Sequence, residues 1–125
     1  MYKISVEHSF AAGHALRGYK GKCENVHGHN YKICVTVAGE KLNATGLLID
    51  FIDLRSALRE LAERLDHRFM NDVPPFDAIN PSAENMAKYF SDGIDAQVRP
   101  HGVRVAAVKV WETDTTSATF IPPAS

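Results

Sequence analysis

The sequence predicts an α+β domain, in which a four-stranded antiparallel sheet carries two helices on one face. Hydrophobic and polar residues alternate near both ends of the chain, as they do in half-buried strands. In the middle of the chain the hydrophobic residues recur every three or four positions, as they do in amphipathic helices. The predicted order is strand, strand, helix, helix, strand, strand. Because the strands do not alternate singly with helices, antiparallel pairing is favoured.

The strands are predicted over residues 2–12, 27–39, 103–112 and 117–121. Alternation in the first two strands gives each a hydrophobic face. The residues on these faces are Ile4, Val6, His8, Phe10, Tyr31, Ile33, Val35 and Val37. Glycines interrupt the pattern between the two strands, so RGYKGK, residues 17–22, is predicted to be an exposed loop.

The first helix is predicted over residues 50–69, with Asp50 as its N-cap. The second helix is predicted to start near residues 81–82, and Gly93 is expected to weaken its end. The inward positions of the two helices are Phe51, Leu54, Leu58, Leu61, Leu65, Ala83, Met86, Phe90 and Ile94.

The chain has 125 residues and a formal net charge of −1, so residues 1–125 are predicted to form a single domain. This charge balance does not suggest a nucleic acid or an anionic membrane as a partner. No hydrophobic run approaches the roughly 18 residues that a spanning helix requires. The N-terminal MYKISVEHSF lacks the hydrophobic core of a signal peptide, so a cytoplasmic protein is expected. Cys23 and Cys34 are accordingly expected to stay reduced.

The segment CENVHGHN, residues 23–30, places two histidines one residue apart. On a strand, His27 and His29 project from the same face, where two imidazoles suit a divalent metal such as zinc. His14 is the best candidate for a third ligand, because it ends the first predicted strand, which can pair antiparallel with the second. Three histidines with an open fourth position are typical of a catalytic zinc site. The competing interpretation is that a short histidine motif recurs by chance.

Two functional roles are open to Cys23. It could close the zinc site as a fourth ligand, which would make the site structural. Alternatively, it could act as a thiolate base, since the charge of neighbouring Lys22 would lower its pKa. Cys34 lies in a hydrophobic strand pattern and is expected to be inert. His8 and His101 are expected to be surface or core residues.

The sequence pattern alone does not decide the roles of three further residues. Glu112 ends a predicted strand, where a carboxylate is usually solvated. In a pocket, however, it can accept two N–H bonds from the edge of a guanidine-like ring. Asp66 and His67 lie near the expected end of the first helix, where the helix dipole favours an imidazolium. Taken alone, this pair is weak support for a catalytic role.

Six segments, taken in order, resemble the family of 6-pyruvoyl-tetrahydropterin synthase and 6-carboxy-tetrahydropterin synthase. They are FAAGHAL, CENVHGHNY, GLLIDFIDL, LDHRFMND, NPSAEN and VWET. The resemblance covers nearly the whole chain. Gly13 departs from the family pattern, in which alanine is usual at this position. The predicted order of strands and helices also agrees with the tunnelling fold of that family.

The resemblance implies an enzyme that acts on 7,8-dihydroneopterin triphosphate. By the family pattern, Zn²⁺ is bound by His14, His27 and His29. The metal would hold the side-chain hydroxyls of the substrate and acidify the adjacent C–H bonds. Cys23 would be the general base on that side chain. No nicotinamide is implied, because the substrate's side chain is oxidised while its ring is reduced.

The resemblance also assigns roles to the remaining candidates. Asp66 and His67 would form a proton relay on the opposite side of the substrate from the thiolate. Glu112 would anchor the pyrimidine edge of the pterin. The family forms trimers that pair into hexamers with active sites between subunits, so a homo-hexamer, a dimer of trimers, is implied. The residues that bind the triphosphate are not assigned, and Lys22, Lys32 and Arg68 are candidates.

The family has several branches. The form in which a cysteine precedes HGH by three residues resembles the 6-carboxy branch, which feeds queuosine. The expected product is therefore 6-carboxy-5,6,7,8-tetrahydropterin, with loss of triphosphate and acetaldehyde. The alternatives are the 6-pyruvoyl branch and a folate-linked branch that forms a 6-hydroxymethyl-dihydropterin. The folate-linked branch uses a glutamate in place of the cysteine, and Glu24 adjoins Cys23 here. A non-catalytic zinc- or pterin-binding module is the alternative class.

Overall fold

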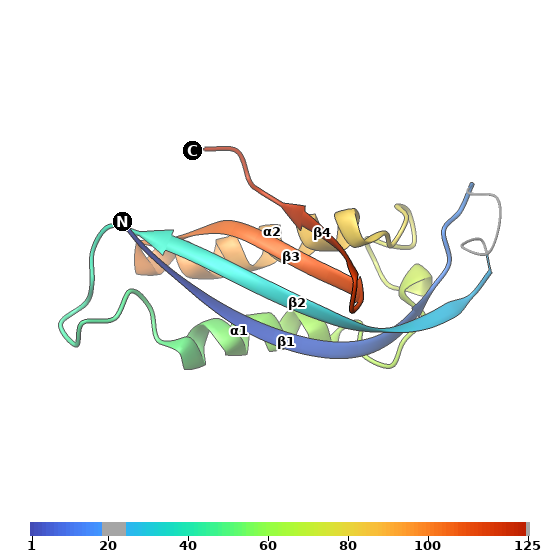
Figure 1. Ribbon diagram of the computed structural model, residues 1–125, viewed down its shortest axis with the longest axis horizontal. Helices are drawn as coiled ribbons and strands as arrows, with labels where there is room; N and C mark the ends of the chain where they lie inside the picture. Colours follow the sequence, from blue (N-terminus) through green and yellow to red (C-terminus); the bar gives the residue numbers. More distant parts are fainter. Residues whose placement is uncertain (19–24, 125) are drawn as a thin grey trace.

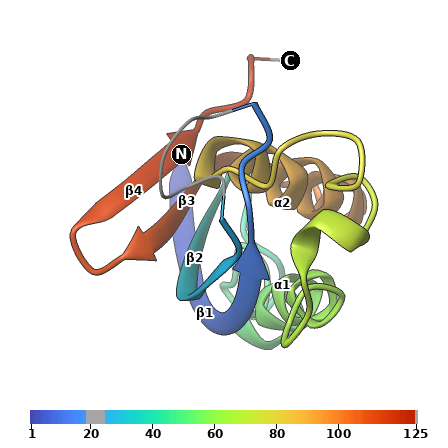
Figure 2. The ribbon, with the colours of Figure 1, turned by 90° about the vertical axis from the view of Figure 1, so that its right-hand side faces the viewer.

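The computed structural model describes residues 1–18 and 25–124. Within these residues the chain forms a four-stranded antiparallel sheet with the strand order β1-β2-β3-β4. The elements in chain order are β1 (Tyr2–His14), β2 (His27–Gly39), α1 (Phe51–Glu63), η2 (Met70–Asp72), α2 (Ala83–Val98), η3 (Arg99–His101), β3 (Arg104–Thr113) and β4 (Thr116–Phe120). Figures 1 and 2 show both α-helices on the same face of the sheet. The predicted class and order are confirmed.

The hydrophobic core lies between the sheet and the two helices. Its residues on β2 alternate as predicted, and Tyr31, Ile33, Val35 and Val37 are all fully buried. Val6 and Phe10 on β1 pair with Val35 and Tyr31 and are also buried. Because side chains alternate along a strand, these inward rows continue to His14 on β1 and to His27 and His29 on β2. The three histidines therefore project from the helix-covered face.

Helix α1 begins as predicted but ends earlier. The side chain of Asp50 accepts a hydrogen bond from the backbone N–H of Ile52 and caps the helix. The prediction that the helix continues to Phe69 was wrong, because the segment after Glu63 turns and runs along the free edge of β1. There the N–H of His67 donates to Ala11 and the N–H of Gly13 donates to Arg68.

Helix α2 begins after Ser82, whose hydroxyl accepts from the N–H of Asn85, as expected of an N-cap. Gly93 does not end this helix, which runs on to Val98. A Cβ atom at Gly93 would lie only 2.7 Å from Leu61 Cδ1 on α1. Glycine at this position therefore lets the two helices approach closely.

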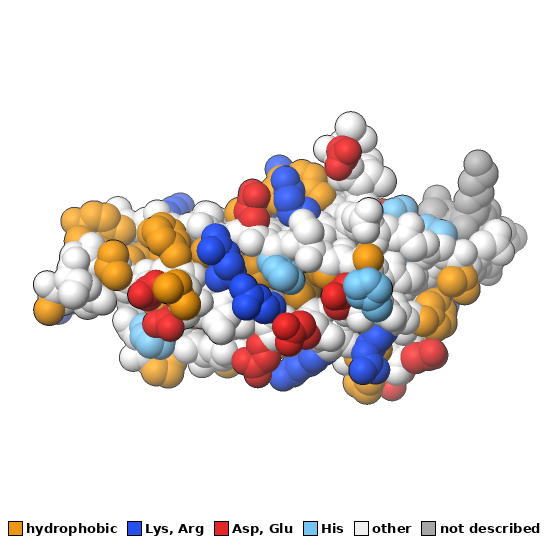
Figure 3. All heavy atoms as spheres, turned by 90° about the horizontal axis from the view of Figure 1, so that it is seen from below, with side chains coloured by type: hydrophobic (Ala, Val, Ile, Leu, Met, Phe, Trp, Pro, Cys, Tyr) orange, Lys and Arg blue, Asp and Glu red, His pale blue; other side chains and the backbone are white. Residues whose placement is uncertain are grey.

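The surface shows no concentration of one charge on the face drawn in Figure 3, where acidic and basic side chains are mixed. Among the residues that the structure describes, no helix combines the length and hydrophobicity needed to cross a membrane.

Candidate metal centre

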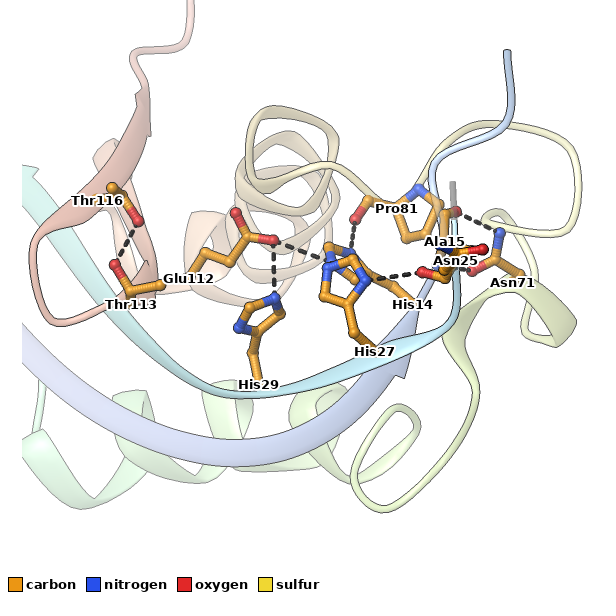
Figure 4. A network of polar contacts seen from close by, with 10 residues as sticks. All are labelled: His14, Ala15, Asn25, His27, His29, Asn71, Pro81, Glu112, Thr113 and Thr116. Carbon is orange, nitrogen blue, oxygen red and sulfur yellow. Dashed lines mark hydrogen bonds and ion pairs between the residues drawn. The ribbon is translucent and has the colours of Figure 1, made fainter. Parts of the chain in front are cut away.

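Four side chains converge at the end of the sheet where β1 finishes and β2 starts. His14, His27, His29 and Glu112 each offer one ligand atom, and these atoms all lie within 4.8 Å of one another (Figure 4). His14 pairs directly with His27 in the antiparallel register, and His29 follows two residues later on the same face. The predicted pairing of the first two strands therefore brings the three histidines together.

Glu112 joins this cluster from β3, one residue beyond the pair that Trp111 forms with Lys32 of β2. Its Oε1 lies 2.9 Å from His14 Nε2 and 3.3 Å from His29 Nε2. Sequence reasoning expected this carboxylate to bind a ring edge and did not expect it among the imidazoles. Glu112 also lines a neighbouring cavity of about 190 Å³ between β4 and the start of α2.

The hydrogen bonds of two histidine rings fix which nitrogen can bind a metal. His14 Nδ1 lies 2.9 Å from the carbonyl oxygen of Pro81, and His27 Nδ1 lies 2.8 Å from that of Asn25. A carbonyl oxygen can only accept, so both Nδ1 atoms carry a proton and donate. Both Nε2 atoms are then available as ligands, which is the usual arrangement of a metal-binding histidine with its orienting partner.

The two Nε2 atoms of His14 and His27 lie 3.0 Å apart. Because both Nδ1 atoms already donate to carbonyl oxygens, the two Nε2 atoms can approach this closely only with a proton or a metal ion between them. The nearby carboxylate adds negative charge, and three imidazoles with one carboxylate form a donor set that suits zinc or a similar divalent ion. The residues present therefore fit a divalent metal.

The burial of His29, the third candidate ligand, also favours metal binding. His29 Nε2 is buried and has no hydrogen-bond partner among the described residues. Burial lowers the pKa of His29, Glu112 opposes this effect, and His14 and His27 add to it. A lowered pKa keeps the imidazole neutral, and the neutral ring is the form that binds metals.

Asp66 and His67 lie outside this cluster, at the edge of β1. Asp66 Oδ1 accepts from the N–H of Ala11 at 3.0 Å and lies 2.9 Å from His67 Nδ1. The pKa of Asp66 is lowered mainly by the Ala11 hydrogen bond and further by His67 and His8. The His67 side chain is 83% exposed. This histidine also borders an apolar hollow of about 520 Å³, which His29 borders as well.

Of the two cysteines, Cys34 lies within the described residues. Cys23, with its neighbours Lys22 and Glu24, lies outside the described residues. Cys34 is a free, half-buried thiol on β2. It alternates with the buried residues Ile33 and Val35, so it lies on the sheet face away from the helices and not in the hydrophobic row. Burial and the charge of Glu7 raise its pKa.

Comparison with known proteins identifies the class to which this fold and site belong. The model of the family described as 6-pyruvoyl tetrahydropterin synthase matches residues 3–123, and the chain belongs to this family. Among its relatives, the human 6-pyruvoyl tetrahydrobiopterin synthase is 39% identical over 90% of this chain and 86% of its own length. The 6-carboxy-5,6,7,8-tetrahydropterin synthase of Synechocystis is 34% identical over 98% and 95%, respectively.

A second relative named 6-carboxy-5,6,7,8-tetrahydropterin synthase, from Aquifex aeolicus, is 30% identical over 95% of this chain and 97% of its own length. The solved structure of 6-pyruvoyl tetrahydropterin synthase from Caenorhabditis elegans superposes with a TM-score of 0.85 and 26% identity, covering 98% of this chain and 96% of that one. The protein is thus a lyase-type enzyme of this pterin synthase family, and its fold is the tunnelling fold of its structural neighbours.

Proposed function

We propose that the protein is a zinc-dependent 6-carboxy-5,6,7,8-tetrahydropterin synthase that serves queuosine synthesis. It would convert 7,8-dihydroneopterin triphosphate with loss of triphosphate and acetaldehyde. The observation that carries the metal part of the proposal is the 3.0 Å approach of the Nε2 atoms of His14 and His27, with both Nδ1 atoms held by carbonyl oxygens. The relatives of that name, 30% and 34% identical, support the branch.

His14, His27 and His29 would hold the zinc, which when bound supplies Lewis acidity to the hydroxyl groups of the substrate side chain. His14 is 1% exposed and its Nδ1 donates to the Pro81 carbonyl, so its ring is held in one orientation. His29 is 22% exposed and borders the hollow of about 520 Å³. The substrate would approach from this side.

Glu112 would recognise the pterin ring. A carboxylate can accept the two adjacent N–H bonds of the pyrimidine edge in a parallel pair. The cavity that Glu112 shares with Thr116 and Ser117 of β4 supports this role, because it places further hydrogen-bonding groups next to the carboxylate. In this role the Glu112 carboxylate would point toward the cavity and away from the imidazoles.

Cys23 would be the general base, and Asp66 with His67 would complete the proton relay. Asp66 and His67 lie at the exposed edge of β1, and His67 borders the same hollow as His29, which supports a place for the pair beside the substrate. We also propose that the chain forms a homo-oligomer, a dimer of trimers. Asp66 would hold the imidazole in one orientation through the 2.9 Å contact with Nδ1, leaving Nε2 directed outward.

A 6-pyruvoyl product is the second candidate, because the human relative of that activity has the higher identity, 39%. Mass analysis of the products formed from 7,8-dihydroneopterin triphosphate by the zinc-loaded protein separates the two reactions. Release of acetaldehyde with a 6-carboxy product supports the proposal. A 6-pyruvoyl product without acetaldehyde overturns the assigned branch, and the absence of turnover together with tight zinc binding would favour a non-catalytic module.

A further inference from the structure

The backbone that follows His14 is no longer paired with β2. The pairing of β1 with β2 ends at His14 and His27, so the next residues need other hydrogen-bond partners. The side chain of Asn71 supplies them for Ala15. Asn71 Oδ1 accepts from the N–H of Ala15 at 3.0 Å, and Asn71 Nδ2 donates to its carbonyl at 2.8 Å. One amide group thus replaces both hydrogen bonds of a neighbouring strand.

Asn80 repeats this arrangement two residues further along. Its Oδ1 accepts from the N–H of Arg17 and its Nδ2 donates to the Arg17 carbonyl, both at 2.9 Å. The guanidinium of Arg17 then returns hydrogen bonds to the loop that carries both asparagines, through the carbonyls of Asn71, Phe76 and Ile79. Each of the two segments, residues 15–17 and the loop 71–80, therefore donates hydrogen bonds to the other.

The same loop also holds the carbonyl that orients His14. Asn85 on α2 donates from Nδ2 to the carbonyl of Asn80 at 2.9 Å. The next residue, Pro81, is buried and accepts from His14 Nδ1 at 2.9 Å. Figure 4 shows the Pro81 carbonyl directed at the histidine cluster and the Asn71–Ala15 pair beside it. Residues 71–81 therefore hydrogen-bond both the backbone that follows His14 and the Nδ1 atom of its ring.

We propose that Asn71 and Asn80 are positioning residues for the metal centre, because their side-chain amides fix the backbone that carries His14 relative to the carbonyl that orients its ring. This inference rests on the metal-binding part of the proposed function. Asn71 is 8% exposed, so water cannot easily replace its hydrogen bonds. Without them the backbone after His14 is free to shift. Metal–ligand distances lie within about 0.2 Å of their characteristic values, so a shift of this backbone would disturb the position of His14 as a ligand.

The test compares metal binding by the full-length protein and by Asn80→Ala and Asn71→Ala. Zinc affinity is measured by competition with a chelator, and the coordination geometry is read from the visible absorption of the Co²⁺-loaded protein. Asn80 is less buried than Asn71, so Asn80→Ala keeps the test available if Asn71→Ala fails to fold. Loss of a hydrogen-bond partner of the ligand itself typically lowers metal affinity about 10–100-fold. Because Asn71 and Asn80 act on His14 through the backbone, we expect a decrease of about 10-fold, the lower end of that range, with an altered Co²⁺ spectrum.

Asn43→Ala is the matched control. Asn43 Oδ1 accepts from the N–H groups of Thr45 and Leu47 and from the Thr45 hydroxyl, so it stabilises a loop in a similar way outside the metal centre. This variant should lower the melting temperature and leave zinc affinity and the Co²⁺ spectrum unchanged. Unchanged binding in both Asn71→Ala and Asn80→Ala, or an equal loss in Asn43→Ala, overturns the positioning role alone. A wild-type protein that binds no metal overturns the proposed function as well.

Discussion

His14 and His27 face each other with their Nε2 atoms 3.0 Å apart, and a carbonyl oxygen holds the Nδ1 atom of each ring. With both Nδ1 atoms donating to carbonyl oxygens, this close approach of the Nε2 atoms requires a proton or a metal ion between them. The fold imposes the approach through the antiparallel pair that His14 and His27 form. The strand register therefore brings the two rings together, and ligands that the fold holds in place lower the entropic cost of binding a cation.

The first prediction concerns this cation. His29→Ala should lose most of the bound zinc and all turnover, because the remaining imidazoles cannot replace its buried Nε2. His101→Ala is the control, since His101 is exposed on η3 and does not belong to the cluster. Metal content is measured by elemental analysis after dialysis. Full zinc occupancy in His29→Ala would contradict the ligand assignment.

The arrangement of the three histidines was predictable from the sequence, and the reason is the strand period. Alternating hydrophobic residues set which face of each strand is buried, and this restricts the register of the pair. Once the hydrophobic rows of β1 and β2 face the same core, His14, His27 and His29 follow on the same side. The sequences of the two strands therefore predicted that these three imidazoles lie close together.

Other parts of the site depend on tertiary structure that leaves little trace in the sequence. The hydrophobic period of α1 continues to Leu65, so nothing local signals that the chain leaves the helix after Glu63 to cover the edge of β1. The carbonyl of Pro81 is a backbone group with no side-chain signature. The position of Glu112 depends on the pairing of β2 with β3, which shifts at a bulge near Thr36.

The second prediction concerns the two thiols. Burial and Glu7 raise the pKa of Cys34, so little of this thiol is ionised at neutral pH. Iodoacetamide should therefore label Cys23 before Cys34, and 7,8-dihydroneopterin triphosphate should slow the labelling of Cys23. Mass mapping of the labelled peptides measures both rates. Preferential labelling of Cys34 would argue against a reactive thiolate at Cys23. Substantial turnover in Cys23→Ala would point to Glu24 as the base.

The third prediction concerns acid stability. The folded-state pKa of Asp66 is lowered, chiefly by the Ala11 hydrogen bond. The ionised carboxylate therefore contributes stability that is fully present above its ordinary pKa of 3.8 and is lost as the pH falls through the lower folded value. Asp66→Asn should be less stable than the wild type at pH 7, and the difference should vanish in strong acid. Urea unfolding across this range measures it, with exposed Asp77→Asn as the control for charge removal. A stability difference between the wild type and Asp66→Asn that persists in acid would exclude the carboxylate charge as its cause.

The fourth prediction concerns the packing of the two helices. Replacing glycine by alanine in a helix is ordinarily favourable by about 1 kcal/mol. At Gly93, however, the new Cβ would lie 2.7 Å from Leu61 Cδ1, and overpacking costs about 1–3 kcal/mol. Gly93→Ala should therefore lower the free energy of unfolding. In a Leu61→Ala background the overlap disappears, so the same substitution should become neutral or stabilising, and a double-mutant cycle by urea unfolding measures this change of sign. Equal effects in both backgrounds would show that Leu61 is not the obstacle.

The last prediction separates the two roles that the structure allows Glu112. Its Oε1 lies 2.9 Å from His14 Nε2, but the same side chain lines the cavity beside Thr116. If three imidazoles hold the zinc and the carboxylate binds the pterin, Glu112→Ala and Glu112→Gln should keep their zinc and their fold. Both variants should bind neopterin more weakly, because the ring edge loses hydrogen bonds to a charged group, at about 1.5–3 kcal/mol each and not additively. Glu112→Gln should lose less affinity than Glu112→Ala, since the amide oxygen still accepts one of the two N–H bonds. Titration with neopterin and elemental analysis of the same samples measure the two effects independently. Zinc loss as large as that of His29→Ala, with unchanged neopterin affinity, would instead make Glu112 a fourth metal ligand.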